Sequence, residues 1–230
     1  MQTTSNPEFI TGIFKRELKN RFLCEVQIDG KDVVCYVPSS CHLSNFLKLE
    51  GKQVLLVPTQ STKSRTKYSL LAVSYRNSYI LLNTSMANRA VEACIHKPRF
   101  SFLGKRSIVI KEHTVYNYKT DLYLQDSDTL VEIKSIISTN KVGIFPTVYS
   151  ERSLKQLKQL QELLRQGHKV CYFIVSLCPT TKEIIVDKNS EFYREFIKCI
   201  QLGMQASAYG CRLSQNKNKT VISKTLPLMF

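Results

Sequence analysis

Two carboxylates and an ammonium group occur in neighbouring segments that have the composition of β-strands. Residues 115–124 and 129–136 are rich in β-branched and aromatic side chains, and the polar segment 125–128 between them has turn chemistry. In a hairpin that is symmetric about Asp126 and Ser127, paired residues have numbers that sum to 253, so Asp121 lies opposite Glu132. Lys134, two residues beyond Glu132, projects from the same face. The spacing therefore predicts that three charged side chains converge.

The other face of this hairpin is apolar, because it carries Leu122, Leu124, Val131 and Ile133, which we expect in a core.

The charged face of the hairpin has the residue types of a metal site. Carboxylates are the ligands that Mg²⁺ or Mn²⁺ prefers, and such an ion can also take a substrate phosphate. Lys134 would then hold the attacking water or offset the negative charge that grows on phosphorus. The competing interpretation is a solvated hairpin face with an ordinary ion pair, and a bulge would break the direct opposition.

The charge of the chain favours a partner that is itself negatively charged. The 230 residues include 33 Lys and Arg against 18 Asp and Glu, which gives a formal net charge of +15. Both parts of the chain have an excess of positive charge. Residues 1–83 carry 11 basic and 6 acidic side chains, and residues 84–230 carry 22 basic and 12 acidic side chains. Nucleic acid is the partner we expect, because phosphate contacts drive association. An anionic membrane surface, or a generally lysine-rich proteome, is the alternative.

The chain has no stretch that predicts membrane insertion or export. No run of 18 apolar residues occurs, and the first seven residues lack the charged and apolar regions of a signal peptide. The eight cysteines include no Cys-x-x-Cys pair, and the four histidines show no metal-ligand spacing. We therefore expect reduced, mostly buried thiols in a cytoplasmic protein, without a zinc site.

The length allows one large domain or two small ones, and the pattern of elements changes near residue 84. Residues 21–28 and 31–37 flank Asp29-Gly30, a strong hairpin signal, and the apolar residues coincide when paired numbers sum to 59. Three further strands are predicted at 53–57, 68–73 and 79–82, with a short helix at 43–48. Five short strands indicate that residues 1–83 form a small β-barrel of OB type.

Helices and strands mix in residues 84–230, which we predict to be an α/β domain. A helix is expected at 87–95, and Ser150 is expected to cap a second helix that ends before Gly167. The nearly continuous apolar run 169–176 predicts a strand inside a covered sheet. A third helix at 191–202, a strand at 206–213 and a loop at 215–219 complete this domain.

The motifs also occur in an order that points to one family. The stretches are Lys15-Arg16, Asn20-Arg21-Phe22, Tyr36-Val37-Pro38 with Leu43, Arg65, Tyr68-Ser69-Leu70, Asn83-Thr84, Asn88, Glu92, Asp121, Val131-Glu132-Ile133-Lys134-Ser135, Phe145-Pro146 and Arg152. With these stretches in this order over most of its length, the chain resembles the sugar fermentation stimulation protein family of bacteria and archaea.

The resemblance implies an OB-like domain joined to a nuclease domain of the PD-(D/E)xK kind, which has a mixed central sheet flanked by helices. It also implies nucleic-acid binding and a link to the expression of sugar-utilisation genes. On that pattern Glu92 would be the helix-borne acid, Asp121 and Glu132 the metal ligands, and Lys134 the lysine of the signature.

This chain departs from the family's pattern at several positions around the expected site. Where the family usually has Asn-Thr-Gly-Arg after Val-Pro, this chain has Ser39, Ser40, Cys41 and His42. Tyr118-Lys119 replaces a Ser-Arg pair, Thr147 replaces an aspartate, and Gln156 stands where a histidine is common. The departures remove hydrogen-bonding and acidic groups but keep the two carboxylates and the lysine, so the sequence predicts metal binding more strongly than rapid turnover.

Two function classes therefore remain open, a metal-dependent phosphodiesterase and a non-catalytic nucleic-acid-binding regulator that keeps a nuclease fold. For either class we expect Arg21, Arg65, Lys67 and Tyr68 on the barrel, with Lys119 and Arg152 on the second domain, to contact nucleic acid. Phe22 and Tyr68 are the aromatic neighbours of these basic residues, and the alternative for both is that they belong to the core of the barrel.

Overall fold

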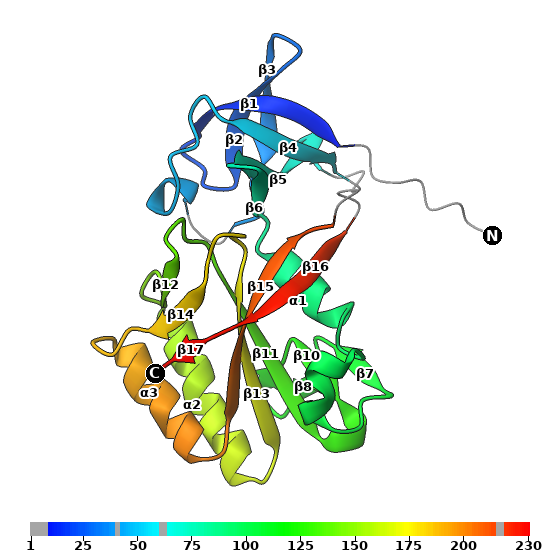
Figure 1. Cartoon of the computed structure of the whole chain (residues 1–230), viewed down its shortest axis with the longest axis vertical. Coiled ribbons are helices and arrows are strands. Elements are labelled where there is room, and N and C mark those ends of the chain that lie inside the picture. Colours follow the sequence, from blue (N-terminus) through cyan, green and yellow to red (C-terminus); the bar gives the residue numbers. More distant parts are fainter. Residues whose placement is uncertain (1–8, 40–41, 60–63, 215–218) are drawn as a thin grey trace, which may run out of the picture.

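The computed structural model describes residues 9–39, 42–59, 64–214 and 219–230. Figure 1 shows a small barrel, formed by the first strands, above a larger unit in which helices cover a central sheet. The elements in chain order are β1 (Ile10–Glu17), β2 (Leu23–Ile28), β3 (Lys31–Tyr36), β4 (Gln53–Pro58), β5 (Tyr68–Tyr75), β6 (Ser78–Leu81), α1 (Ser85–Glu92), β7 (Val109–Lys111), β8 (Thr114–Val115), β9 (Tyr118–Lys119), β10 (Leu122–Leu124), β11 (Thr129–Ile136), β12 (Val142–Phe145), α2 (Glu151–Arg165), β13 (Lys169–Ser176), β14 (Glu183–Val186), α3 (Glu191–Gln201), β15 (Gln205–Leu213), β16 (Thr220–Leu226) and β17 (Leu228–Met229). Short 3₁₀ turns occupy Leu43–Asn45, Pro98–Leu103 and Gln125–Ser127.

The barrel is built on the predicted hairpin of β2 and β3. Asp29 and Gly30 both have positive φ angles, 48° and 78°, as the tight turn between right-twisted strands requires. The pairs Val26↔Val33 and Cys24↔Cys35 confirm the predicted register. The strands follow the order β3-β2-β1-β4-β5-β6, and a contact between β3 and β5 closes the first five into a barrel. The predicted small β-barrel is therefore confirmed.

The strand β1 has no counterpart among the predicted elements. Its sequence has Gly12 in the interior, and glycine lowers strand propensity, so the pattern is weak there. The structure gives the reason for this glycine. A Cβ atom at Gly12 would come within 2.5 Å of a methyl group of Val26 and 2.9 Å of the carbonyl oxygen of Gln27. The neighbouring strand thus approaches too closely for any side chain.

The second unit contains a six-stranded mixed sheet in the order β16-β15-β13-β11-β10-β7. β13 spans the predicted residues 169–176 and pairs in parallel with both β11 and β15, so it is buried in the middle of the sheet. The side chain of Ser150 accepts a hydrogen bond from the backbone N–H of Ser153, which is the predicted cap of α2. Gly167, just after α2, has a φ angle of 94°, a conformation that favours glycine at a helix exit.

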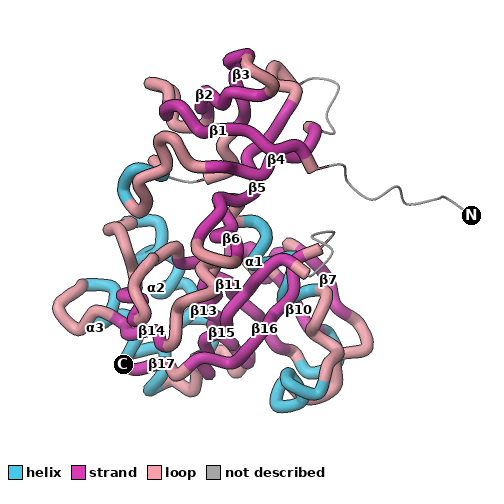
Figure 2. Tube along the Cα trace, turned by 45° about the horizontal axis from the view of Figure 1, so that its top comes forward, coloured by secondary structure: helices cyan, strands magenta, loops and turns pink. Residues whose placement is uncertain are grey.

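Helices cover both faces of this sheet, and Figures 1 and 2 show α2 and α3 on one side with α1 on the other. Leu130, Tyr172 and Ile174 point into the core below α2 and α3, whereas Val131 and Phe173 point into the core below α1. The second of these cores is continuous with the interior of the barrel. β12, β14 and β17 form a separate small parallel sheet, and these three strands, like β16, have no counterpart among the predicted elements.

The predicted single strand at 115–124 is wrong. Tyr116 has a left-handed φ angle of 51°, so the chain turns, and β8 pairs with β9 in a small hairpin of their own. Only Leu122–Leu124 continue as a strand beside β11. The hydroxyl group of the buried Thr120 then donates to the carbonyl oxygen of Val131, which fixes the point where the chain joins the sheet. The break also places Tyr118 where its hydroxyl group can reach Glu132.

Seven cysteines lie in the part of the chain that the structure describes, and all seven are free and buried. Cys41 and residues 215–218 of the predicted loop at 215–219 lie outside the described residues. Burial raises the pKa of the Cys35 thiol to about 11 and that of Cys171 to about 12, so neither is a thiolate at neutral pH. Among the described residues, no helix is long and apolar enough to cross a membrane.

The first prediction concerns these thiols. Titration of the denatured protein without a reducing agent should find all eight cysteines free, because the described ones are buried from oxidants and lie outside any disulfide. A native titration before denaturation serves as the control and should react far more slowly. A substantial shortfall after denaturation, or zinc at stoichiometric amounts, would contradict the expectation of reduced thiols.

Candidate metal site

The hairpin of β10 and β11 has the predicted register, since Leu122 pairs with Val131 and Leu124 with Thr129. Asp121 comes directly before β10, at the end of this ladder. One oxygen of its carboxylate, Oδ2, accepts the backbone N–H of Ile133 at 2.7 Å. The side chain of Asp121 thus takes the place of a strand carbonyl where the neighbouring strand stops, which brings its charge against the middle of β11.

Glu132 is almost completely buried, with 2% of its surface exposed. Its Oε1 atom accepts a hydrogen bond from the ammonium group of Lys134 at 2.5 Å, and its Oε2 atom accepts one from the hydroxyl group of Tyr118. The same ammonium group also donates to Oε1 of Gln156, on α2, at 2.8 Å. Lys134 is therefore fixed between the sheet and the helix that covers it.

The second oxygen of Asp121, Oδ1, accepts a hydrogen bond from Nδ2 of Asn88 at 2.8 Å. Asn88 lies on α1, where it holds Asp121 directly, whereas Gln156 lies on α2 and reaches Glu132 through Lys134. Figure 1 shows α1 and α2 on opposite sides of β11. The carboxylate pair is consequently supported from both helix layers.

The electrostatics of the pair show an excess of negative charge. Burial, and then the charge of Glu132, raise the pKa of Asp121 from its ordinary value to about 6. The N–H group of Ile133, the ammonium group of Lys134 and the amide of Asn88 act in the opposite direction without cancelling the rise. Two carboxylates thus share one lysine, and one negative charge remains to be balanced.

The donor set fits a hard divalent cation. Each of the four carboxylate oxygens of Asp121 and Glu132 accepts one protein hydrogen bond, and a carboxylate oxygen has two lone pairs, so each can still bind a metal. The part of the chain that the structure describes contains no cluster of three or more His, Cys, Asp or Glu side chains arranged for a metal. Any ion held here would have a pair of protein carboxylates and would keep several waters.

Glu92, the acid expected from the helix, is not brought to this pair. It lies one turn after Asn88 on α1, and its carboxylate forms an ion pair with Lys111 of β7 at 3.0 Å. Asn88 therefore occupies the position on α1 that faces Asp121. The role of Glu92 as a catalytic acid stays a prediction.

The basic residues that were predicted to bind nucleic acid lie on both units. Arg21, Arg65, Lys67 and Arg152 are exposed, while Lys119 is also exposed but pairs with Glu112 at 2.6 Å. Tyr68 is partly buried and packs against the core of the barrel, which agrees with the alternative that it is a core residue.

The positions that depart from the family's pattern have different surroundings. Gln156 contacts Lys134 directly, whereas Thr147 is exposed in the loop before α2. Ser39 is buried, and Nδ1 of His42 lies 3.5 Å from Oε1 of Glu17. Ser40 and Cys41 lie outside the described residues.

The second prediction concerns the buried charge of Asp121. In Asp121→Asn the new amide oxygen can still accept the backbone N–H of Ile133. The new amide nitrogen can donate to the side-chain oxygen of Asn88 once the Asn88 amide has flipped, so the fold should persist. The folded protein binds the Asp121 proton more tightly than the unfolded chain, so the wild type loses stability as pH rises from about 4 to 6. Without metal, the variant should therefore become more stable than the wild type over that range, by up to about 3 kcal/mol in the free energy of unfolding. This difference should stay constant above pH 6.

Denaturant unfolding in EDTA at several pH values measures this gain. Asp126→Asn, two residues beyond β10, is the control, since the N–H of Ile108 lowers the pKa of Asp126 and its loss should destabilise the protein at neutral pH. If Asp121→Asn is equally destabilised at pH 4 and pH 7, the carboxylate of Asp121 is not under electrostatic strain.

Comparison with known proteins places the chain in a family. Residues 17–82 match the model described as the SfsA N-terminal OB domain, and residues 85–217 match the model of the sugar fermentation stimulation protein RE domain. A sugar fermentation stimulation protein homolog from Natranaerobius thermophilus is 27% identical over 89% of this chain and 88% of its own length. One from Desulfitobacterium hafniense is 28% identical over 86% and 87%.

A solved structure has the same fold. The SfsA protein of Pyrococcus furiosus, determined in complex with Ca²⁺, covers 97% of this chain and 96% of its own length with a TM-score of 0.84 and 19% sequence identity. Both domains of the present chain, in the same order, therefore have counterparts in one family. The chain belongs to the sugar fermentation stimulation protein family.

Proposed function

We propose that this protein binds nucleic acid and hydrolyses its phosphodiester bonds with a divalent cation held by Asp121 and Glu132. The observation that carries the proposal is the pair of carboxylates with one shared lysine, in which one negative charge is left over and the pKa of Asp121 is raised. A cation is the simplest way to balance that charge. The relative from Pyrococcus furiosus was solved with Ca²⁺, a hard cation that takes oxygen ligands, which supports the same chemistry here.

When bound, Mg²⁺ or Mn²⁺ would supply Lewis acidity and an activated water at the phosphate. The residues of this chain have separate tasks around it. Asn88 and the N–H of Ile133 orient Asp121, while the hydroxyl of Tyr118 orients Glu132. Lys134, held by Glu132 and Gln156, places a positive charge where negative charge develops on the phosphorus centre.

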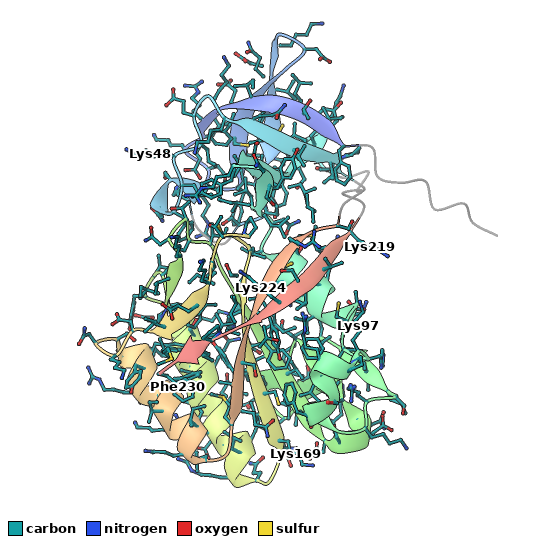
Figure 3. The ribbon with its side chains drawn as sticks, viewed as in Figure 1. Lys48, Lys97, Lys169, Lys219, Lys224 and Phe230 are labelled. Atoms are coloured by element: carbon teal, nitrogen blue, oxygen red, sulfur yellow. The ribbon has the colours of Figure 1, made fainter. Side chains whose placement is uncertain are left out.

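A basic surface supports nucleic acid as the substrate. The chain carries a formal net charge of +15, and Figure 3 shows labelled lysines on both units, with Lys48 on the barrel and Lys97, Lys169 and Lys219 on the second. Positive charge of this extent attracts phosphate backbones without regard to sequence. We place part of the binding surface at Arg65 and Lys67, which are exposed in the segment between β4 and β5.

A specific observation favours a second function, that of a DNA-binding regulator of sugar-utilisation genes without turnover. Glu92, the acid expected from the helix, forms an ion pair with Lys111 and is not brought to the carboxylate pair. A protein that only binds needs the basic surface and not the carboxylates. Substitution of Glu132 separates the two functions, since it should remove cleavage and leave affinity.

The third prediction tests cleavage. Glu132→Gln keeps an oxygen for Lys134 and an amino group that can donate to the oxygen of Tyr118, but removes the charge that binds the cation. It should nearly abolish cleavage that depends on Mg²⁺ or Mn²⁺. Lys134→Ala should lower the rate on the order of 10²- to 10³-fold, as for the loss of one preorganised donor. Affinity measured in EDTA should change little in either variant.

Glu50→Gln is the matched control, because Glu50 is an exposed glutamate of the barrel, in the segment before β4. Initial rates on single- and double-stranded DNA and RNA provide the measurement. Wild-type protein without metal-dependent cleavage of any of these would leave the regulator as the better account. Cleavage that persists in Glu132→Gln would mean that the catalytic site lies elsewhere.

The fourth prediction tests the barrel surface. Changing Arg65 and Lys67 together to Ala should weaken binding of single strands and reduce the slope of log affinity against log salt by roughly 0.7 for each phosphate that the variant no longer binds. The double variant Lys31→Ala with Lys52→Ala removes the same charge from other exposed positions of the barrel and is the control. An unchanged slope in the first double variant would remove this segment from the binding surface.

A further inference from the structure

Two exposed aromatic side chains of the barrel lie near each other with nearly parallel rings. Phe22 is 38% and Tyr36 is 39% exposed, and their ring centroids lie 6.5 Å apart with an angle of 20° between the ring planes. The guanidinium carbon of Arg21 lies 4.7 Å from the centroid of the Phe22 ring. Other aromatics of the barrel, such as Phe14 and Tyr68, are buried or pack against its core. Phe22 and Tyr36 thus form a surface platform next to a cation.

A cavity that is open to solvent begins at this platform and extends to the second unit. Its volume is about 430 Å³, within the range of about 300–1,000 Å³ that small-molecule sites occupy. It lies at the seam where Tyr36 of β3 pairs with Ser69 of β5 and where α1 begins. The lining residues are Tyr36, Pro38, Ser39, Ser69, Asn83, Thr84 and Ser85.

The lining indicates which chemical group fits. Among the residues that the structure describes, the lining contains hydroxyl groups and one amide and no charged side chain. The N–H groups at the start of α1 are already used, because those of Ser85 and Met86 donate to the side chain and the carbonyl of Asn83. A phosphate would therefore find neither a counter-charge nor these N–H donors there. A neutral, flat ring with several hydrogen-bonding edges matches the hydroxyl-rich lining and the aromatic wall of Tyr36.

From these observations we infer that the cavity receives one base of a single-stranded nucleic acid. The adjacent base stacks on Phe22 and Tyr36, and its phosphate lies near Arg21. A duplex cannot use this site, because its bases are paired and stacked within the helix. The inference rests on the proposed function and narrows its substrate to single strands or to duplexes with an extruded base.

The position of the cavity relative to the carboxylate pair supports this assignment. Ser85 lines the cavity, and Asn88, three residues further along α1, holds Asp121. Three residues of α-helix advance about 4.5 Å along the axis. A strand with a base in the cavity would therefore carry its backbone toward Asp121, so that one helix connects recognition of a base with the proposed site of hydrolysis.

Fluorescence anisotropy of a labelled single-stranded oligothymidylate, measured with the full chain in EDTA, tests the inference. Phe22→Leu and Tyr36→Leu keep an apolar side chain but remove the ring, and each should weaken binding by about 5- to 100-fold. Tyr36→Phe should keep most of the affinity. The salt dependence should stay unchanged in these variants, since the rings contact no phosphate.

Phe230→Leu is the matched control, because Phe230 is 39% exposed and its ring packs against Phe196 of α3. Figures 2 and 3 show that this end of the chain lies away from the barrel. Ser85→Phe provides a second approach, since it fills the cavity from α1 without changing the barrel strands and should also weaken binding. An oligonucleotide with abasic positions should bind the wild type less tightly and show no further loss with Tyr36→Leu.

Unchanged affinity in Phe22→Leu, Tyr36→Leu and Ser85→Phe would overturn the inference, and so would an equal loss of affinity for a blunt duplex. In either case the proposed hydrolysis would stand as long as Glu132→Gln abolished cleavage. If the aromatic variants lose single-strand affinity but no nucleic acid is cleaved, the base site stands and the phosphodiesterase fails. A wild-type protein that binds no nucleic acid overturns both.

Discussion

The burial of two carboxylates beside one lysine is the interaction on which the arrangement of this site depends. Asp121 takes the place of a strand carbonyl at Ile133, and this contact brings its charge against Glu132 inside the sheet. Hydrogen bonds to the two carboxylates partly offset their repulsion. The donors are Asn88 of α1, Tyr118 of β9 and Lys134 of β11 itself. Burial, and then the charge of Glu132, still raise the pKa of Asp121, so these contacts do not fully offset the cost of burying two carboxylates together. A site held under such strain is suited to bind a cation, because the cation supplies the missing positive charge.

Much of the fold could be predicted from local sequence, because the spacing of apolar residues and the residue types of turns act over short distances along the chain. The polar turn at 125–128 and the alternation of Leu122, Leu124 and Val131 were enough to predict the register of β10 and β11. The apolar run of β13 and the cap at Ser150 were equally clear, since each depends on neighbours in the chain. The fold class, an OB barrel followed by a mixed sheet with helices, followed from the same signals and from the family's motifs.

The partners of the carboxylates could not be predicted in this way. Asn88 and Gln156 reach the pair from helices on opposite faces of the sheet, and no periodicity states which polar residue of a helix will face a given strand. The composition around Tyr118 predicts a continuous strand, whereas the left-handed Tyr116 breaks that strand and turns the next residues toward Glu132. Glu92 has the correct residue type and lies one turn from Asn88, but Lys111 holds it. Tertiary contacts decided each of these cases.

A crystal structure of the protein soaked with Mn²⁺, with an anomalous difference map, would show whether Asp121 and Glu132 hold a cation. We expect one strong peak within bonding distance of both residues, about 2 Å from a carboxylate oxygen of each, with Asn88 and Lys134 still in contact with the pair. A map without a peak at that position at saturating Mn²⁺, with Lys134 as the sole positive charge beside the two carboxylates, would contradict this expectation.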